Sequence, residues 1–584
     1  MYTWDLSVFY KGFDDVNFIS DQEKIRCLNS QVENIISLNQ ADEEKLCDII
    51  RHNESIINIL NRLFNFVHLT LATDTSNEKA LEAYDALAQL EMESTLATAK
   101  FTRYIGGIKN LDEIINSNDL LKTHAFILKE EAERANHMLP ENVETWMLRM
   151  SLSGADAFSK LRGRIMGEHT VEYNGETMPF PAIRGMAYDS DAMVRKSAYE
   201  AEIGSYESIQ TPMAYCLMNI KREGNTMAKA KGFNSLLEEQ LYNARMDKET
   251  LDAMLTAIKE KLPIFQRYLI AKAKYLGHKN GLPFYDLFAP IGKNSLRYTP
   301  DEAKDLLINT FNNVDKDMGD FIKECFDNNY IDLFPKVGKE GGAFCSGNHD
   351  LKQSRILCNF MGSFSDVSTL AHELGHGWHD RCLTRVPVLL SDVPMPLAET
   401  ASIFNETVLS HAISENADND TEISLLDNRL MEATQTVVDI YSRFLFESRV
   451  VETCDSGTKK ADTLNKWMTE AQIEAYGEGL DHNLLNHGMW INKGHYYSKD
   501  LHFYNFPYAF GLLFSLLIYG KYQKEGKLFL KTYHYLLSQC GSFNISDVAK
   551  QVGIDVKNVE TWRMALAVVE KDVEEFEKLV NGHL

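Results

Sequence analysis

The chain of 584 residues lacks the features of a secreted or membrane-spanning protein. Its first residues, Met1 to Asp5, contain neither a basic stretch nor an apolar one, so we expect no signal peptide. The longest apolar run, near residues 508–519, includes glycine and is shorter than the ~20 residues that a transmembrane helix needs. We therefore expect a soluble protein with no membrane partner.

Paired cysteines and excess positive charge are also missing. The nine cysteines are an odd number without Cys-x-x-Cys spacing, which is typical of free thiols in a reducing cytoplasm. Lys and Arg number 60 against 84 Asp and Glu, a formal net charge of -24. Because contacts to phosphate need basic side chains, this balance argues against nucleic acid as a partner. It is compatible with a cytoplasmic enzyme.

The chain does contain His-Glu-x-x-His, within the stretch Thr369–Asp380. On a helix, His372 and His376 fall on one face about a turn apart, so both imidazoles can reach one metal ion. Glu373 lies beside them and can take a proton from a water whose pKa a zinc ion lowers to about 7. The motif predicts a zinc hydrolase, although an amphipathic helix with two hydrogen-bonded histidines remains the alternative. Gly375, which costs about 1 kcal/mol in a helix, suggests close approach by another backbone or a substrate.

A catalytic zinc needs a third protein ligand and an open position. Residues 396–406 form a predicted second helix, with Pro396 near its start. Glu399 and Glu406 are seven residues apart and hence on one face, where buried carboxylates need a cation or a hydrogen bond. We predict that Glu399 is the third ligand and that Glu406 orients a ligand histidine. A solvated acidic face is the alternative for both.

These residues resemble the thimet oligopeptidase and oligoendopeptidase F family of zinc metallopeptidases, most of all the bacterial oligoendopeptidase F branch. The resemblance covers nearly the whole chain. It rests on His372–His376 with residues 396–399, and on the stretches Trp4–Leu6, 9–15, Gly341–Cys345, Ile356–Phe360, Gly494–Tyr497 and Phe503–Gly511.

The resemblance implies roles for a C-terminal loop, because the family uses a histidine and tyrosines there to stabilise the carbonyl oxygen. It carries this role to His495 and Tyr508, and less directly to Tyr504, since the aromatic spacing differs between branches. From the residues alone, aromatic packing is the alternative. The family places its site deep in a channel between helical halves, which excludes folded proteins.

The helical periodicity is nearly continuous from Ser20 to about Leu139, with breaks at 37–42, 73–78 and 106–107. Asn174-Gly175 between β-prone runs predicts a tight hairpin, and Thr299-Pro300 predicts the start of another helix. We expect a helical N-terminal domain over 1–185, ending in that hairpin, and a catalytic domain over 186–584. Residues 339–347 are rich in glycine and predict an edge strand, to which a peptide could add as an extra strand; a hairpin without a ligand is the alternative.

The sequence thus predicts a mainly α-helical, zincin-like peptidase with a small β-sheet beside the zinc helix and a deep substrate channel. We expect one zinc ion per chain, bound by His372, His376 and Glu399, with Glu373 as general base and short peptides as substrates. A zinc exopeptidase of the carboxypeptidase type, and a non-catalytic helical binding protein with a vestigial metal site, remain as alternatives. The sequence does not indicate the oligomeric state.

Overall fold

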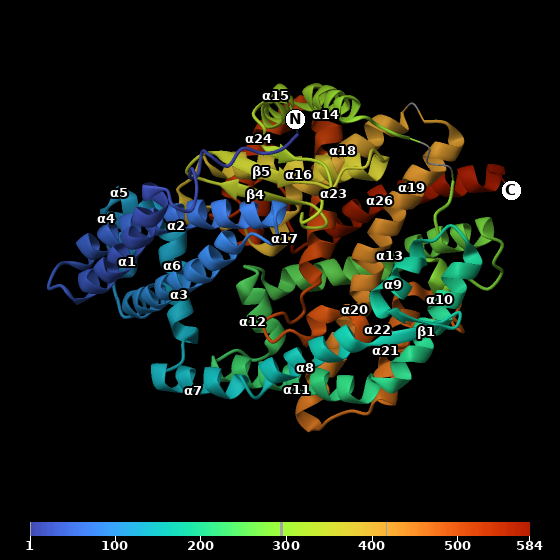
Figure 1. Ribbon diagram of the computed structural model, residues 1–584, viewed down its shortest axis with the longest axis horizontal. Coiled ribbons are helices and arrows are strands. Elements are labelled where there is room, and N and C mark those ends of the chain that lie inside the picture. The colour runs from blue at the N-terminus through green and yellow to red at the C-terminus, as the bar shows by residue number, and fades with distance from the viewer. Residues whose placement is uncertain (1, 293–295, 416, 584) are drawn as a thin grey trace. The chain divides into compact units, whose positions relative to one another are not determined.

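The computed structural model describes residues 2–292, 296–415 and 417–583, and it is mainly helical, as predicted (Figure 1). The chain forms two compact units, each assembled from three stretches. The first comprises 1–138, 296–412 and 521–553, and the second 139–295, 413–520 and 554–584. The domain boundary expected between residues 185 and 186 stays a prediction. Within the described ranges, no helix combines the length and the apolar character needed to span a bilayer.

The first unit carries most of the sheet structure and the helix of the His-Glu-x-x-His motif. Its strands are β3 (Ile331–Asp332), β4 (Phe344–Asn348) and β5 (Gln353–Leu357). Its helices are α1 (Val16–Ser37), α2 (Asp42–Thr73), α3 (Glu78–Gly106), α4 (Leu111–Ser117), α5 (Asp119–Thr123), α6 (Ala125–Arg134), α14 (Pro300–Val314), α15 (Lys316–Asp327), α16 (Phe364–Leu383), α17 (Met395–Ala398), most of α18 (Thr400–Ser414), α24 (Lys527–Gln539) and α25 (Ile545–Gln551).

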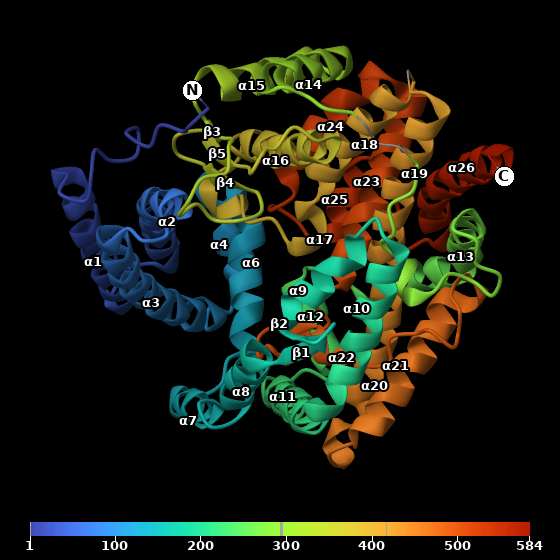
Figure 2. The ribbon, with the colours of Figure 1, turned by 45° about the vertical axis from the view of Figure 1, so that its right-hand side comes forward.

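The helices α1, α2 and α3 pack side by side (Figures 1 and 2). They end and begin at the breaks that the sequence predicts, after Ser37, Thr73 and Gly106. The side chains of Asp15 and Asn77 accept hydrogen bonds from the first turns of α1 and α3, which satisfies backbone donors that a helix start leaves unpaired. Their facing sides bury leucine, isoleucine and phenylalanine in one hydrophobic core.

The three-stranded sheet has the order β3-β5-β4 and packs beside α16 (Figure 2). Strand β4 pairs antiparallel with β5, from Phe344 opposite Leu357 to Asn348 opposite Gln353. The predicted edge strand is therefore present as β4, although it begins a few residues later than the glycine-rich stretch. Part of its open edge is covered, because Asn65 of α2 donates a hydrogen bond to the carbonyl of Gly347 at 2.9 Å.

The second unit consists of helices and one hairpin, around a core that includes Trp490. Its strands are β1 (Thr170–Tyr173) and β2 (Glu176–Pro179). Its helices are α7 (Glu141–Ser151), α8 (Ala155–Glu168), α9 (Phe180–Gly185), α10 (Ala192–Ser205), α11 (Gln210–Ala230), α12 (Leu236–Asn243), α13 (Lys248–Tyr275), α19 (Asn419–Ala433), α20 (Ile440–Thr453), α21 (Ala461–Tyr476), α22 (Met489–Asn492), most of α23 (Phe506–Glu525) and α26 (Val559–His583).

Two local predictions are confirmed by the backbone. Strands β1 and β2 pair antiparallel across Asn174 and Gly175, whose φ angles of 52° and 85° give the left-handed conformation that a two-residue hairpin turn requires. Helix α14 begins at Pro300, and Thr299 forms a reciprocal capping box with Glu302.

Candidate active site

Helix α16 presents the two histidines of the motif. Its start is defined by Ser363 and Asp366, which cap each other's backbone amides. Leu370 and Leu374 are fully buried on one side of the helix. His372 and His376, four residues apart, are about three-quarters buried and project on a different side, as the period of a helix requires.

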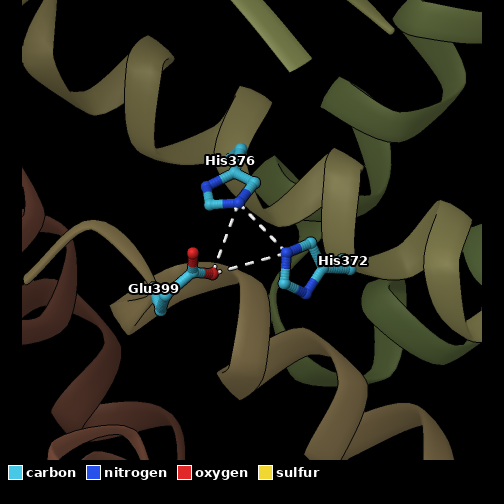
Figure 3. Close-up of side chains that lie close together, drawn as sticks. All are labelled: His372, His376 and Glu399. Carbon is cyan, nitrogen blue, oxygen red and sulfur yellow. Dashed lines mark hydrogen bonds and ion pairs between the residues drawn. The ribbon is translucent and has the colours of Figure 1, made fainter. Parts of the chain in front are cut away.

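His372, His376 and Glu399 converge on one point (Figure 3). The two histidine Nε2 atoms lie 3.1 Å apart, and each lies 3.4 Å from Glu399 Oε2. Tetrahedral zinc with ligand bonds of about 2.0 to 2.1 Å separates its ligand atoms by roughly 3.3 Å. The three donors are thus of the right chemistry and spacing for a zinc ion, and they leave a fourth position for a water or a substrate.

Glu399 occupies a break between two helices, where a single helix over 396–406 was predicted. Helix α17 ends at Ala398, and α18 begins at Thr400. The Ser402 hydroxyl donates to Glu399 Oε2 at 2.6 Å, and the Ile403 amide donates to the Glu399 carbonyl. The Ser402 hydroxyl thus holds the Glu399 carboxylate in place, while the Glu399 carbonyl accepts the first backbone hydrogen bond of α18.

Gly375 allows helix α18, which carries Glu406, to lie close to α16. A Cβ atom built at this position would lie 2.6 Å from Cα of Ser402 and 2.7 Å from the Ala401 carbonyl oxygen. The close approach that the glycine suggests in the sequence is therefore made by the backbone of α18.

Glu406 lies on the far side of the first histidine from the metal point. Its Oε1 is 2.5 Å from His372 Nδ1, which fixes the ring so that Nε2 faces the cluster. Burial alone would lower the pKa of His372, but the hydrogen bond and the charge of Glu406 raise it to about 9. Burial lowers the pKa of His376 to about 4, so this ring is neutral and can bind a cation.

Glu373 faces a cavity beside the cluster. The side chain is only 6% exposed, and burial raises the pKa of its carboxyl to about 7, although the charge of His372 opposes this shift. A carboxyl with a pKa near neutrality is suited to exchange protons. The cavity has a volume of about 480 Å³ and is lined by Gly342, Ala343, Cys358, Asn359, Phe360, Asp366, Thr369, His372, Glu373 and Glu406.

The three loop residues named by the resemblance lie together in the second unit. Tyr504 and Tyr508 share a hydrogen bond of 2.6 Å between their hydroxyls. The ring centres of His495 and Tyr504 are 5.9 Å apart, and His495 Nε2 lies 2.7 Å from the side-chain nitrogen Nδ2 of Asn505. The structure therefore gathers an imidazole and two phenols into one cluster.

Buried charges anchor this cluster through the neighbouring chain. Lys221 of α11 is fully buried and lies 2.6 Å from Glu447 Oε1 of α20 and 3.1 Å from His502 Nδ1. Glu447 Oε1 also accepts a hydrogen bond from the amide of Phe503, whose φ is 51°. The bond holds the Phe503 backbone in a left-handed conformation that residues other than glycine rarely adopt.

Asn505, which contacts the histidine of the loop, and Arg443, which contacts Asn505, were not predicted from the sequence. Arg443 Nη1 donates to Asn505 Oδ1 at 3.1 Å. Asn505 lies inside the stretch that carries the resemblance, and a polar residue among aromatic ones was the available signal. Arg443 lies on α20, 62 residues away in the sequence, and no local pattern points to it.

Two histidines and a glutamate that converge beside a buried carboxylate form an arrangement suited to a metallopeptidase. The model of the peptidase family M3 matches residues 185–568 of the chain. The chain therefore belongs to peptidase family M3. Two curated relatives agree: the oligoendopeptidase F homolog of Lactococcus lactis is 24% identical over 99% of this chain and 97% of its own length. Oligopeptidase PepF of Bacillus subtilis is 24% identical over 92% of this chain and 81% of its own.

Solved structures show the same fold. The oligoendopeptidase-F of Enterococcus faecium matches with a TM-score of 0.70 and 18% identity over 97% of this chain and 99% of its own. A Chlamydophila abortus chain classed as a peptidase matches with a TM-score of 0.87 and 22% identity, covering 99% and 98% of the two chains.

The contact at Gly375 leads to a prediction. Gly375→Ala places a methyl group against the α18 backbone, so the two helices must separate and Glu399 and Glu406 must move relative to the histidines. We expect a lower melting temperature and weaker zinc binding, measured by thermal unfolding and by competition with a chelator. Gly204→Ala in α10 is the control, because a Cβ there meets nothing within 4 Å. Wild-type zinc affinity in Gly375→Ala would show that the helix contact does not set the metal site.

Proposed function

We propose that the chain is a zinc-dependent endopeptidase that cleaves internal bonds of short oligopeptides in the cytoplasm. Family membership supports peptide hydrolysis, and the names of several relatives specify oligoendopeptidase activity for those proteins. The observation that carries the proposal is the convergence of His372, His376 and Glu399 next to the buried carboxyl of Glu373.

The metal would be held by Nε2 of His372, Nε2 of His376 and Oε2 of Glu399, with one ion per chain. Bound there, zinc lowers the pKa of a water and polarises a carbonyl group. Glu406 keeps the His372 ring in the orientation that binding requires, since its carboxylate accepts a hydrogen bond from the Nδ1–H group.

Glu373 is the proposed general base. Burial raises the pKa of its carboxyl to about 7, and a cation bound nearby would lower it again, so that the group would be ionised at neutral pH. Its carboxylate takes a proton from the attacking water and delivers it to the leaving nitrogen. Without that delivery, the amine would have to leave as a poor anionic leaving group.

His495 and Tyr508, with Tyr504 as the alternative phenol, are proposed to donate hydrogen bonds to the carbonyl oxygen. Negative charge builds on that oxygen during attack, so a donor there stabilises the transition state more than the substrate. The hydrogen bond between the two phenols means that either tyrosine influences the other's proton.

The substrate is proposed to lie extended along the glycine-rich segment before β4. Gly342 and Ala343 line the same cavity as Glu373, and small residues let a peptide backbone come near. Such pairing reads backbone rather than side chains. A deep channel that excludes folded proteins stays a prediction from the resemblance.

One experiment tests the endopeptidase proposal against the carboxypeptidase alternative. A quenched-fluorescence peptide with both ends blocked is incubated with the zinc-loaded protein, beside the same peptide with free ends. We expect cleavage of both at the same internal bond. An intact blocked peptide beside a trimmed unblocked one would favour an exopeptidase, and no cleavage of either would favour a binding protein.

The first prediction here concerns the base. Glu373→Gln keeps the shape of the side chain and removes no proposed ligand, so zinc content should stay at one ion per chain. Turnover should fall by several orders of magnitude, because the proton acceptor is gone. Metal analysis and kcat on the same preparation decide the matter: a zinc-loaded Glu373→Gln protein with near-normal kcat contradicts the mechanism.

A second prediction separates the two carboxylates of the following helices. Glu399→Ala should abolish most zinc binding, because it removes one of three ligands. Glu406→Ala should weaken zinc binding or activity by about 10- to 100-fold, the usual effect of losing a group that orients a ligand. Chelator competition measures the zinc affinity of both variants. If Glu406→Ala loses the metal and Glu399→Ala does not, Glu406 is the ligand and Glu399 the orienting residue.

A third prediction concerns the phenols. Tyr508→Phe removes one hydroxyl and little volume, so fold and zinc should survive while kcat falls about 10²- to 10³-fold with a small change in KM. Because Tyr504 and Tyr508 are hydrogen-bonded, the double variant should lose less than the product of the single losses. A loss at Tyr504→Phe alone would move the role to Tyr504, and no loss at either would exclude the phenols.

A further inference from the structure

We infer that Asn505 and Arg443 are positioning residues that hold His495 in the tautomer with its proton on Nδ1. Nδ1 of His495 can then donate a hydrogen bond but cannot accept one. The inference rests on the proposed function in one respect: the oxygen that receives this hydrogen bond would be the carbonyl oxygen of the peptide. The tautomer itself can be measured without catalysis.

The contact with Arg443 fixes the orientation of the Asn505 side-chain amide. Arg443 Nη1 lies 3.1 Å from Asn505 Oδ1, and a guanidinium has donors only. The amide oxygen must therefore face Arg443, because the reversed amide would set two donors against each other. Its NH₂ group then faces His495, with Nδ2 2.7 Å from Nε2. Since an amide NH₂ can only donate, Nε2 must be the acceptor, and the proton of a neutral ring is on Nδ1.

Arg443 is itself fixed. Its Nη2 donates to Asp439, which is 3% exposed, and its backbone carbonyl accepts a hydrogen bond from the Tyr496 hydroxyl at 3.3 Å. Asp439 ends a π-helical segment, Thr434–Asp439, that precedes α20. π-helical segments are rare in proteins, and those that occur are often found at functional sites. Asp439, Arg443, Asn505 and His495 thus form a chain in which each hydrogen bond has one possible direction.

The surroundings of His495 oppose the doubly protonated ring, which would donate from both nitrogens. Burial, and then the positive charges of Arg443, Lys221, Lys493 and Arg162, lower the pKa of His495 to about 3. The nearby carboxylates are already engaged, Asp439 by Arg443 and Glu447 by Lys221. A neutral imidazole can still polarise a carbonyl group as a hydrogen-bond donor. His495 Nδ1 has no hydrogen-bond partner among the residues described, so its proton is available to a ligand.

The substitution Asn505→Asp tests the chain of hydrogen bonds. A carboxylate has the size of the amide and keeps the contact to Arg443, but it accepts hydrogen bonds on both oxygens. It should draw the His495 proton to Nε2 and leave a lone pair on Nδ1, which repels a carbonyl oxygen. At pH 8 we expect folded, zinc-loaded protein whose kcat is about 10²- to 10³-fold lower, with KM changed little, as for loss of one donor. Asn558→Asp, which adds the same charge at an exposed turn, should keep full activity.

Nitrogen NMR of histidine-labelled protein gives the direct readout, with the His495 signals assigned by their absence in His495→Phe. In the wild-type protein Nδ1 should carry the proton and Nε2 should not; in Asn505→Asp the two should exchange. A proton on Nε2 in the wild type overturns the inference, whether or not Asn505→Asp folds, and so does an unchanged tautomer in a folded Asn505→Asp protein. If Nδ1 is protonated but His495→Phe keeps full kcat, the tautomer assignment stands and the proposed role of His495 in catalysis fails.

Discussion

The backbone contact between α16 and α18 is the constraint on which the metal site depends. Glycine in the middle of a helix costs about 1 kcal/mol relative to alanine, and Gly375 lies directly before a proposed ligand. That cost is offset by what the contact allows, because Ala401 and Ser402 can approach to within the space of a missing methyl group. Glu399 then reaches both histidines, and Glu406 reaches the outer nitrogen of His372. The geometry of the donors thus follows from the distance between two helices.

This geometry gathers charges that repel one another unless a cation is present. Three carboxylates, Glu373, Glu399 and Glu406, lie around two imidazoles in a largely buried place. Although burial opposes it, the hydrogen bond with Glu406 raises the pKa of His372 to about 9, and burial raises that of Glu373 to about 7, so the cluster can hold protons at neutral pH. A divalent ion that replaces those protons relieves the repulsion, so metal affinity and proton release are coupled. The acidity of the site is therefore a reason for it to bind a cation.

The sequence could predict those parts of the fold and of the site whose physical cause is local. The hairpin at Asn174-Gly175, the helix start at Thr299 and the one-turn spacing of His372 and His376 each depend on a few neighbouring residues. The break at Glu399 was not predicted, because the pattern of apolar residues continues through it; there the Ser402 hydroxyl donates to the Glu399 carboxylate. The partners of His495 were out of reach for another reason. Arg443 is distant in the sequence, and only the tertiary fold brings it to Asn505.

The second unit solves a different problem, that of holding a polar loop in one conformation. The buried pair Lys221 and Glu447 would cost several kcal/mol in desolvation if either charge lacked a partner. Glu447 uses its remaining hydrogen-bonding capacity on the amide of Phe503, and so it stabilises a left-handed residue directly before Tyr504. Buried ion pairs contribute little net stability but tolerate few alternative arrangements, since each displaced charge is penalised. A loop anchored this way holds its imidazole and phenols already oriented, so the proposed donors would need little reorganisation when charge develops on a substrate.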